Sequence, residues 1–240
     1  FAFLLRRGIK NAEVVQTISN FLADWAKKFG YTRRIEVIPN GVDIEKFRSQ
    51  NEKVKDNDKT ILITTSRLVK KNAVADIINS LEFLPESVCL KILGSGPLHT
   101  KLNQLVRNKN LESRVEFAGY VNLKNIPEYL HNADIFVRPS LSEGMGSSFV
   151  EAMAAGLPVI ATPVGGIPDF LFDPDKNKNH HPTGLFVNVH DPKDIAKQVT
   201  RLMKDQKLRE TLINNGKRLV REKYDWGLIT EQMRSKVFLS

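Results

Sequence analysis

The sequence is short of several features that define common protein classes. Cys89, in the apolar run VCLKIL, is the only cysteine among 240 residues. No disulfide can therefore form within one chain, and we expect Cys89 to be a buried strand residue in a reducing cytoplasm. No apolar run approaches the roughly 20 residues of a membrane-spanning helix. An apolar content of 41% and a charged content of 26% are ordinary for a globular protein, and the length allows one large or two small domains.

Acidic residues are also in the minority. The formal net charge is +9, and residues 1–34 carry seven Lys or Arg against Glu13 and Asp24. Such a bias can hold a protein against anionic lipid, so it indicates peripheral contact with a membrane surface or, equally, a solvated basic face. Basic residues are not interleaved with aromatic ones as in single-strand nucleic-acid binders, so we expect no nucleic-acid partner.

From residue 60 onward, apolar strands alternate with helical segments. Alternation of this kind predicts a parallel sheet covered by helices. The expected fold class is α/β, a Rossmann-like parallel sheet with helices on both faces, and its ligands should bind at the carboxyl ends of the strands. The expected strands are 60–68, 88–94, 115–121, 134–140, 158–162 and 184–189.

The two ends of the chain have a different pattern. Apolar alternation predicts strands over 14–19 and 35–40 on either side of a helix over 20–30, which Gly30 ends. The polar stretch 48–59 is typical of a linker. At the other end, two helical stretches precede the aromatic pair Tyr224 and Trp226, and a helical tail follows it.

Residues 139–158, PSLSEGMGSSFVEAMAAGLP, form the most informative stretch. Glu143 and Glu151 flank a turn rich in Gly and Ser that leads into a helix. A helix N-terminus entered through small residues presents free N–H groups and a positive dipole end, which suits a diphosphate. Both acids could then meet hydroxyl groups of the same ligand. Alternatively, Ser148 and Glu151 form a capping box and Glu143 is a solvated loop acid.

The stretch resembles the donor site of retaining glycosyltransferases with the GT-B fold, family four. The resemblance implies that Glu143 contacts the transferred sugar and that Glu151 contacts the ribose of the donor nucleotide. It places the rest of the donor site on the intervening turn: Gly144, Met145, Gly146, Ser147 and Ser148.

Other motifs follow the order of this family. Arg67 and Lys71, with Lys70 as the alternative, stand where the family places an Arg and a Lys that hold the leaving phosphates. The commonest pattern has Lys before a Gly, where this chain has Asn72-Ala73. Gly94 and Gly96 belong to a G-x-G-P element near the nucleotide. The third glycine of a dinucleotide fingerprint is absent, which argues against a nicotinamide-dependent oxidoreductase. Val121 lies in a segment whose backbone meets the base.

The resemblance also divides the chain. Residues 1–42, ending in the Asn-Gly-Val-Asp hinge motif at 40–43, would be a remnant of an N-terminal acceptor domain. Residues 43–222 would be the nucleotide-sugar-binding domain, the C-terminal half of a GT-B enzyme, and residues 223–240 a helix that crosses back. Most of the N-terminal domain would then be missing, and we expect this chain alone to be inactive in transfer.

Asp173 and Asp175 could be mistaken for a D-x-D metal motif, with His180 and His181 nearby. The segment is polar, bounded by prolines and not delivered by a strand, so we expect a surface loop and neither a metal nor a cofactor.

The expected activity is the transfer of a hexosyl unit from a nucleotide diphosphate sugar to a glycan or a lipid-linked acceptor, with retention and without a metal. No residue is an obvious nucleophile or base, which suits front-side displacement. The alternatives are a non-catalytic nucleotide-sugar-binding module and a GT-B-type epimerase. The nucleotide (UDP, GDP or ADP), the sugar and the acceptor are left open.

Overall fold

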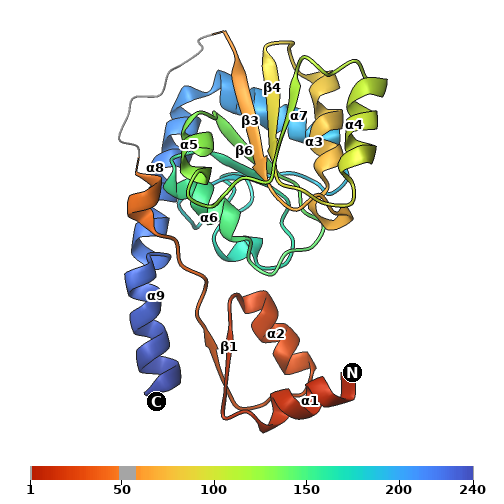
Figure 1. Cartoon of the computed structure of the whole chain (residues 1–240). Coiled ribbons are helices and arrows are strands. Elements are labelled where there is room, and N and C mark those ends of the chain that lie inside the picture. Colours follow the sequence, from red (N-terminus) through yellow and green to blue (C-terminus); the bar gives the residue numbers. More distant parts are fainter. Residues whose placement is uncertain (1, 49–57, 240) are drawn as a thin grey trace.

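The computed structural model describes residues 2–48 and 58–239, and it contains a six-stranded parallel sheet (Figure 1). The strand order is β5-β4-β3-β6-β7-β8, the doubly wound order of dinucleotide-binding folds. The expected fold class is therefore confirmed. The strands are β3 (Thr60–Thr65), β4 (Val88–Leu93), β5 (Val115–Gly119), β6 (Ile135–Arg138), β7 (Val159–Ala161) and β8 (Leu185–Phe186).

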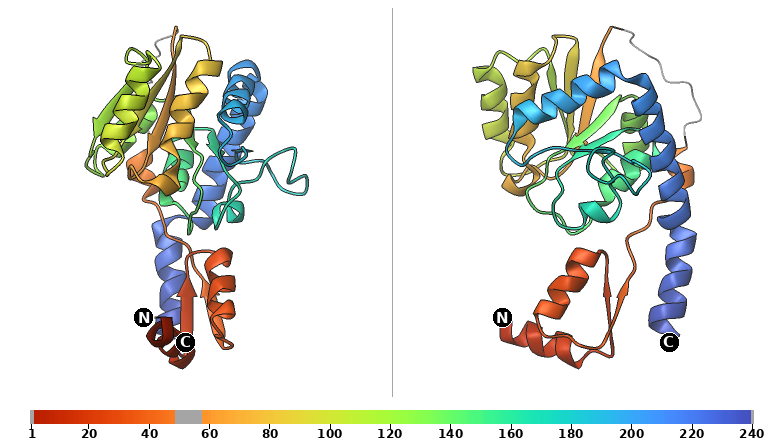
Figure 2. Two further views of the ribbon diagram at one scale, coloured as in Figure 1. Left: turned by 90° about the vertical axis from the view of Figure 1, so that its right-hand side faces the viewer. Right: turned by 180° about the vertical axis from the view of Figure 1, so that it is seen from behind.

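Helices cover both faces of this sheet, and the side chains of β6 show why. Ile135 and Val137 point into one apolar core, whereas Phe136, between them, points into the other. The first core is closed by α3 (Val74–Ser80), α4 (His99–Asn108) and α7 (Pro192–Lys204). The second is closed by α5 (Ile126–His131) and α6 (Ser147–Ala154), with α8 (Gln206–Lys223) packed beside α6 (Figure 2).

The N-terminal residues form a smaller unit. It contains α1 (Ala2–Asn11), β1 (Val14–Thr17), α2 (Asn20–Lys28) and β2 (Arg34–Val37), and β1 and β2 pair in parallel in a sheet of their own. Ser19 caps α2, since its hydroxyl accepts a hydrogen bond from the Leu22 N–H at 3.3 Å. The strands and α2 agree with the sequence analysis, which identified no element before residue 14.

Backbone contacts join the two units near the C-terminus. The Val42 N–H donates to the Tyr224 carbonyl at 2.7 Å, and the Trp226 N–H donates to the Val42 carbonyl at 3.3 Å. The 3₁₀ helix η1 (Ile44–Phe47) then leads into the larger unit. At the other end, α9 (Trp226–Met233) and η5 (Arg234–Phe238) extend back toward the level of the N-terminal unit (Figure 1). The boundaries at residues 42 and 222 stay predictions.

The predicted linker 48–59 lies almost wholly outside the described residues. Cys89 lies in β4 as expected, but it is half-buried and not fully buried. Among the helices of residues 2–48 and 58–239, none combines the length and apolarity needed to span a bilayer.

Candidate functional site

The strand order reverses between the neighbouring strands β3 and β6, because the chain crosses from the edge strand β5 to β6 beside β3. In doubly wound sheets, ligands bind in the crevice at this switch point, beyond the carboxyl ends of the strands. Here the loop after β3 meets the loop after β6, because the Leu141 N–H donates to the Lys71 carbonyl at 2.7 Å. The N-terminus of α6 follows the second loop. Most of the site residues expected from the sequence lie on these two loops and on α6.

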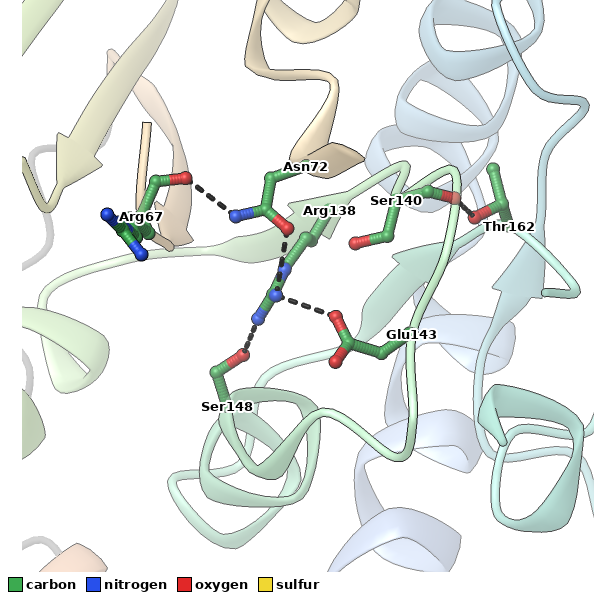
Figure 3. A network of polar contacts seen from close by, with 7 residues as sticks. All are labelled: Arg67, Asn72, Arg138, Ser140, Glu143, Ser148 and Thr162. Atoms are coloured by element: carbon green, nitrogen blue, oxygen red, sulfur yellow. Dashed lines mark hydrogen bonds and ion pairs between the residues drawn. The ribbon is translucent and has the colours of Figure 1, made fainter. Parts of the chain in front are cut away.

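A buried arginine that the sequence analysis did not select lies at the centre of this region (Figure 3). Arg138 ends β6 and is 9% exposed. Its Nη1 donates to Ser148 Oγ at 2.6 Å, and its Nη2 donates to Glu143 Oε2 at 2.7 Å and to Asn72 Oδ1 at 3.2 Å. Burial lowers the pKa of the guanidinium, and the nearby carboxylates oppose that shift. A basic residue at the end of an otherwise apolar strand was the available signal.

Glu143 is buried and paired, so its interpretation as a solvated loop acid is wrong. The side chain forms an ion pair with Arg138, and the backbone carbonyl accepts a hydrogen bond from the Gly166 N–H at 3.1 Å. Gly165 has a φ of +59°, and a Cβ there would lie 1.7 Å from the Glu143 carbonyl oxygen. Only glycine fits that approach, so the segment around residue 165 supports the Glu143 backbone.

The N-terminus of α6 has no side-chain cap. Its N-cap residue is Gly146, with a φ of +84°, and Ser148 is the second residue of the helix. The capping-box interpretation is therefore wrong, because the Ser148 hydroxyl accepts from Arg138 instead. The Phe149 N–H donates to the Gly146 carbonyl at 3.1 Å. The N–H groups before it in the first turn are left without a side-chain cap. Glu151 lies one turn further on, and burial raises the pKa of its carboxyl group while Arg138 opposes the rise.

The expected cations after β3 lie at the surface. Arg67 is exposed, as are Lys70 and Lys71 in the 3₁₀ helix η2 (Lys70–Asn72). The residue that points inward is Asn72, whose Nδ2 donates to the Arg67 carbonyl at 2.6 Å. Ala73, next in the chain, has the left-handed conformation that usually calls for glycine, with a φ of +48°.

Gly94, Gly96, Val121 and Arg67 line one cavity of 490 Å³ at the ends of β3, β4 and β5. The glycines are explained first by packing within the chain. A Cβ at Gly94 would lie 1.9 Å from the Ser66 carbonyl oxygen, and one at Gly96 would lie 2.6 Å from that of Leu68.

Two large side chains on the rim of this cavity were not among the expected site residues. Tyr120 is 78% exposed and Leu123 is 76% exposed, and both line the cavity. Their apolar surfaces can cover a flat ring held there.

The D-x-D segment is only partly the surface loop that the sequence suggested. Asp173 is buried, and its carboxylate accepts hydrogen bonds from the N–H groups of Asp175 and Phe186 at 2.8 and 2.7 Å. Asp175 is exposed and pairs with Arg201, which lowers the pKa of the Asp175 carboxyl. Within the described ranges, no three His, Cys, Asp or Glu side chains are grouped as metal ligands.

Two protein-family models match the chain. The model described as glycosyl transferases group 1 matches residues 45–219, and that described as glycosyltransferase family 4 matches residues 1–46. An uncharacterized glycosyltransferase of Methanocaldococcus jannaschii is 32% identical over 83% of this chain and 52% of its own length. The N-acetyl-α-D-glucosaminyl L-malate synthase of Bacillus anthracis is 30% identical over 95% of this chain and 60% of its own length. The chain thus spans between half and two thirds of these relatives.

Solved structures with the same fold superpose on almost the whole of this chain. Anabaena HepE in complex with UDP and glucose superposes with a TM-score of 0.89 at 20% identity, over 100% of this chain and 67% of that one. The sucrose-phosphate synthase of Thermosynechococcus elongatus superposes with a TM-score of 0.86 at 25% identity, over 98% of this chain and 60% of that one. At 20% identity, the HepE match shows a shared fold and nothing more.

Proposed function

Since the chain belongs to the group 1 glycosyl transferases, we propose that it is the donor-binding, C-terminal half of a retaining GT-B glycosyltransferase. The reaction moves a hexosyl unit from a nucleotide diphosphate sugar to a glycan or a lipid-linked acceptor. One observation carries the proposal: two buried or half-buried carboxyl groups, an uncapped helix N-terminus and a cationic loop all meet at the switch point of the sheet.

Each part of the site has a proposed role. The cavity beside Gly94, Gly96 and Val121 holds the nucleoside. Arg67, Lys71 and the turn from Gly144 to Ser148, in which the Met145 side chain is buried in the core, hold the diphosphate. Glu143 binds hydroxyls of the sugar, and Glu151 binds the ribose.

The chemistry needs stabilisation of the negative charge that develops on the departing diphosphate. The exposed cations after β3 and the helix N–H groups supply electrostatic stabilisation, with no metal or cofactor. Glu143 and Glu151 are assigned to hydroxyl groups of the donor, so no side chain at the site is assigned the role of a nucleophile. The leaving phosphate therefore takes the acceptor proton in a front-side displacement, which retains the anomeric configuration.

The names of relatives support a sugar nucleotide but leave its base open. One Mycobacterium tuberculosis relative is named as a GDP-mannose-dependent mannosyltransferase, whereas the Anabaena structure holds UDP and glucose. Thermal shift against UDP-, GDP- and ADP-sugars tests the proposal, because a ligand that binds only the folded state raises the unfolding midpoint. Absence of any shift across the panel would remove it. A shift that survives a chelator supports metal-independent binding.

The same panel separates the alternatives. An epimerase would convert the sugar of the bound nucleotide, which chromatography of the recovered ligand would reveal. A non-catalytic module would bind the nucleotide sugar and give no transfer even when joined to a complete N-terminal domain.

We place the protein in the cytoplasm, in peripheral contact with the membrane surface. Exposed Lys27, Lys28, Arg33 and Arg34 lie on the basic N-terminal unit, together with the partly exposed Trp25. Sedimentation with vesicles that contain anionic lipid, and not with neutral ones, is the expected result.

A further inference from the structure

We propose that Arg138 is a positioning residue of the donor site, which fixes Glu143 and Ser148 in the orientation that the donor sugar and its phosphates require. The inference rests on the proposed function, because it concerns the same site. It adds a buried cation to the surface cations expected from the sequence.

The network around Arg138 spans both loops of the site. Asn72 receives a hydrogen bond from Arg138 through Oδ1 and donates to the Arg67 carbonyl through Nδ2. Arg138 in turn holds Glu143 and Ser148 (Figure 3). A continuous chain of hydrogen bonds therefore runs from the loop after β3 to the first turn of α6. The position of one cationic loop is coupled to that of the sugar-binding acid.

A role in stability alone explains this arginine poorly. Burial of a guanidinium costs free energy that its partners only partly return, and apolar side chains often fill such a place with no loss of stability. In addition, Arg138 Nε is buried and has no hydrogen-bond partner among the described residues. The arrangement is thus not optimised as a structural ion pair, and a function in ligand binding accounts for its cost.

The contacts leave the right atoms free for a ligand. Arg138 occupies Oε2 of Glu143, so Oε1 can accept a hydrogen bond from a sugar hydroxyl. The Ser148 oxygen accepts from Arg138, so the hydroxyl proton can be donated to a phosphate oxygen. A carboxylate held by a charge-assisted hydrogen bond loses little rotational freedom when the donor binds.

The test compares sugar nucleotides with the matching diphosphates. Calorimetry measures the affinities for UDP-glucose and UDP, and for GDP-mannose and GDP, in the parent chain and its variants. The ratio of the affinity for a sugar nucleotide to that for its diphosphate is the sugar contribution. Arg138→Met is expected to reduce that contribution about tenfold. Arg138→Lys keeps the charge, but a single ammonium group cannot reach all three acceptors, so it should restore only a small part of the loss.

A double-mutant cycle shows whether Arg138 acts through Glu143. In a Glu143→Gln background, Arg138→Met should change the sugar contribution less than about twofold. The control is Arg114→Met, which removes an arginine that donates to the backbone carbonyls of Val88 and Pro85, away from the site. It should affect stability and leave the sugar contribution unchanged.

The outcomes separate the two proposals. If the parent chain binds no sugar nucleotide of the UDP, GDP and ADP panel, the proposed function fails, and the role of Arg138 fails with it. If the parent binds and Arg138→Met retains the full sugar contribution, only the positioning role is wrong. Full recovery by Arg138→Lys would also overturn it, in favour of a simple charge effect. Should Arg138→Met not fold, Arg138→Lys in both backgrounds completes the cycle.

Discussion

Burial of the Glu151 carboxyl group makes the stability of the folded protein depend on pH. Its pKa is raised above the ordinary value of 4.5, first by burial, with Arg138 opposing. A carboxyl group whose pKa is higher in the folded than in the unfolded protein destabilises the fold when ionised. The penalty is complete above the raised pKa and disappears as the pH falls through it toward the unfolded value.

We therefore expect Glu151→Gln to raise the unfolding midpoint at pH 7 and to lose this advantage as the pH falls toward 4.5. The same variant should weaken nucleotide binding, because the ribose loses a charged acceptor. Thermal unfolding across the pH range and calorimetry with UDP or GDP give the two readouts. A variant that is stabilised but binds the nucleotide normally would contradict the ribose role.

Glu143→Gln is the matched comparison for Glu151→Gln. It should leave the affinity for UDP or GDP near that of the parent and reduce discrimination among donor sugars, since its proposed partner is the sugar. Calorimetry with glucose- and mannose-bearing nucleotides measures this. A large loss of affinity for the bare diphosphate would place Glu143 at the phosphates.

The surface cations after β3 give a third prediction at this scale. Arg67→Ala and Lys71→Ala should each weaken binding of a nucleoside diphosphate much more than binding of the nucleoside, because charge-assisted hydrogen bonds to phosphate are the strongest ones available. Lys70→Ala is the control from the same turn. A reversed result, with Lys70 sensitive and Lys71 not, would place the phosphate contact one residue earlier.

At the scale of elements, the segment around Gly165 and the loop after β6 depend on each other. Gly165→Ala would place a Cβ 1.7 Å from the Glu143 carbonyl oxygen, so the backbone of the site must move. Gly119→Ala is a matched control, since Gly119 has a similar φ of +67° and a Cβ there would meet no neighbouring atom within 4 Å. Gly119→Ala should cost only about 1 kcal/mol from strain. Gly165→Ala should cost more and lower the affinity for sugar nucleotides, which chemical denaturation and calorimetry measure.

The elements themselves could largely be predicted from the sequence. Apolar runs bounded by turn residues located every strand of the large sheet, because parallel strands are buried on both faces. The alternation also predicted that ligands bind at the carboxyl ends of these strands. The last strand is only Leu185–Phe186, shorter than the predicted range 184–189. An apolar run does not show how many residues of its neighbour, here β7, are available for pairing.

Tertiary contacts set the limits of that prediction. Ser148 fits the spacing of a capping box, but the left-handed Gly146 moves the helix start and Arg138 takes the hydroxyl. Arg138 was overlooked because its partners come from residues 72, 143 and 148, which no local pattern brings together. Asp173 seemed a surface acid for the same reason, since its partner Phe186 lies on β8.

At the scale of the whole molecule, the two units contact each other at the edge of the proposed donor site. The Asn20 N–H, at the start of α2, donates to the Asp169 carboxylate at 2.7 Å. Asn40 Nδ2 donates to Ser147 Oγ at 3.4 Å, at the start of α6. The N-terminal unit thus already contacts the edge of the proposed donor site.

We expect residues 1–240 to bind a sugar nucleotide without transferring the sugar to an acceptor. In the proposed GT-B arrangement the acceptor is held by the other domain, and we propose that the parallel strand pair with α1 and α2 is the part of it in residues 1–240. Holding both substrates in reactive geometry supplies much of the rate enhancement, so loss of one wall should reduce turnover by several orders of magnitude. Slow hydrolysis of the bound donor can persist, because water needs no acceptor pocket. Radiolabelled donor with a mixture of lipid-linked and glycan acceptors measures both rates, and transfer at the pace of an intact enzyme would show that the acceptor pocket is already complete in this chain.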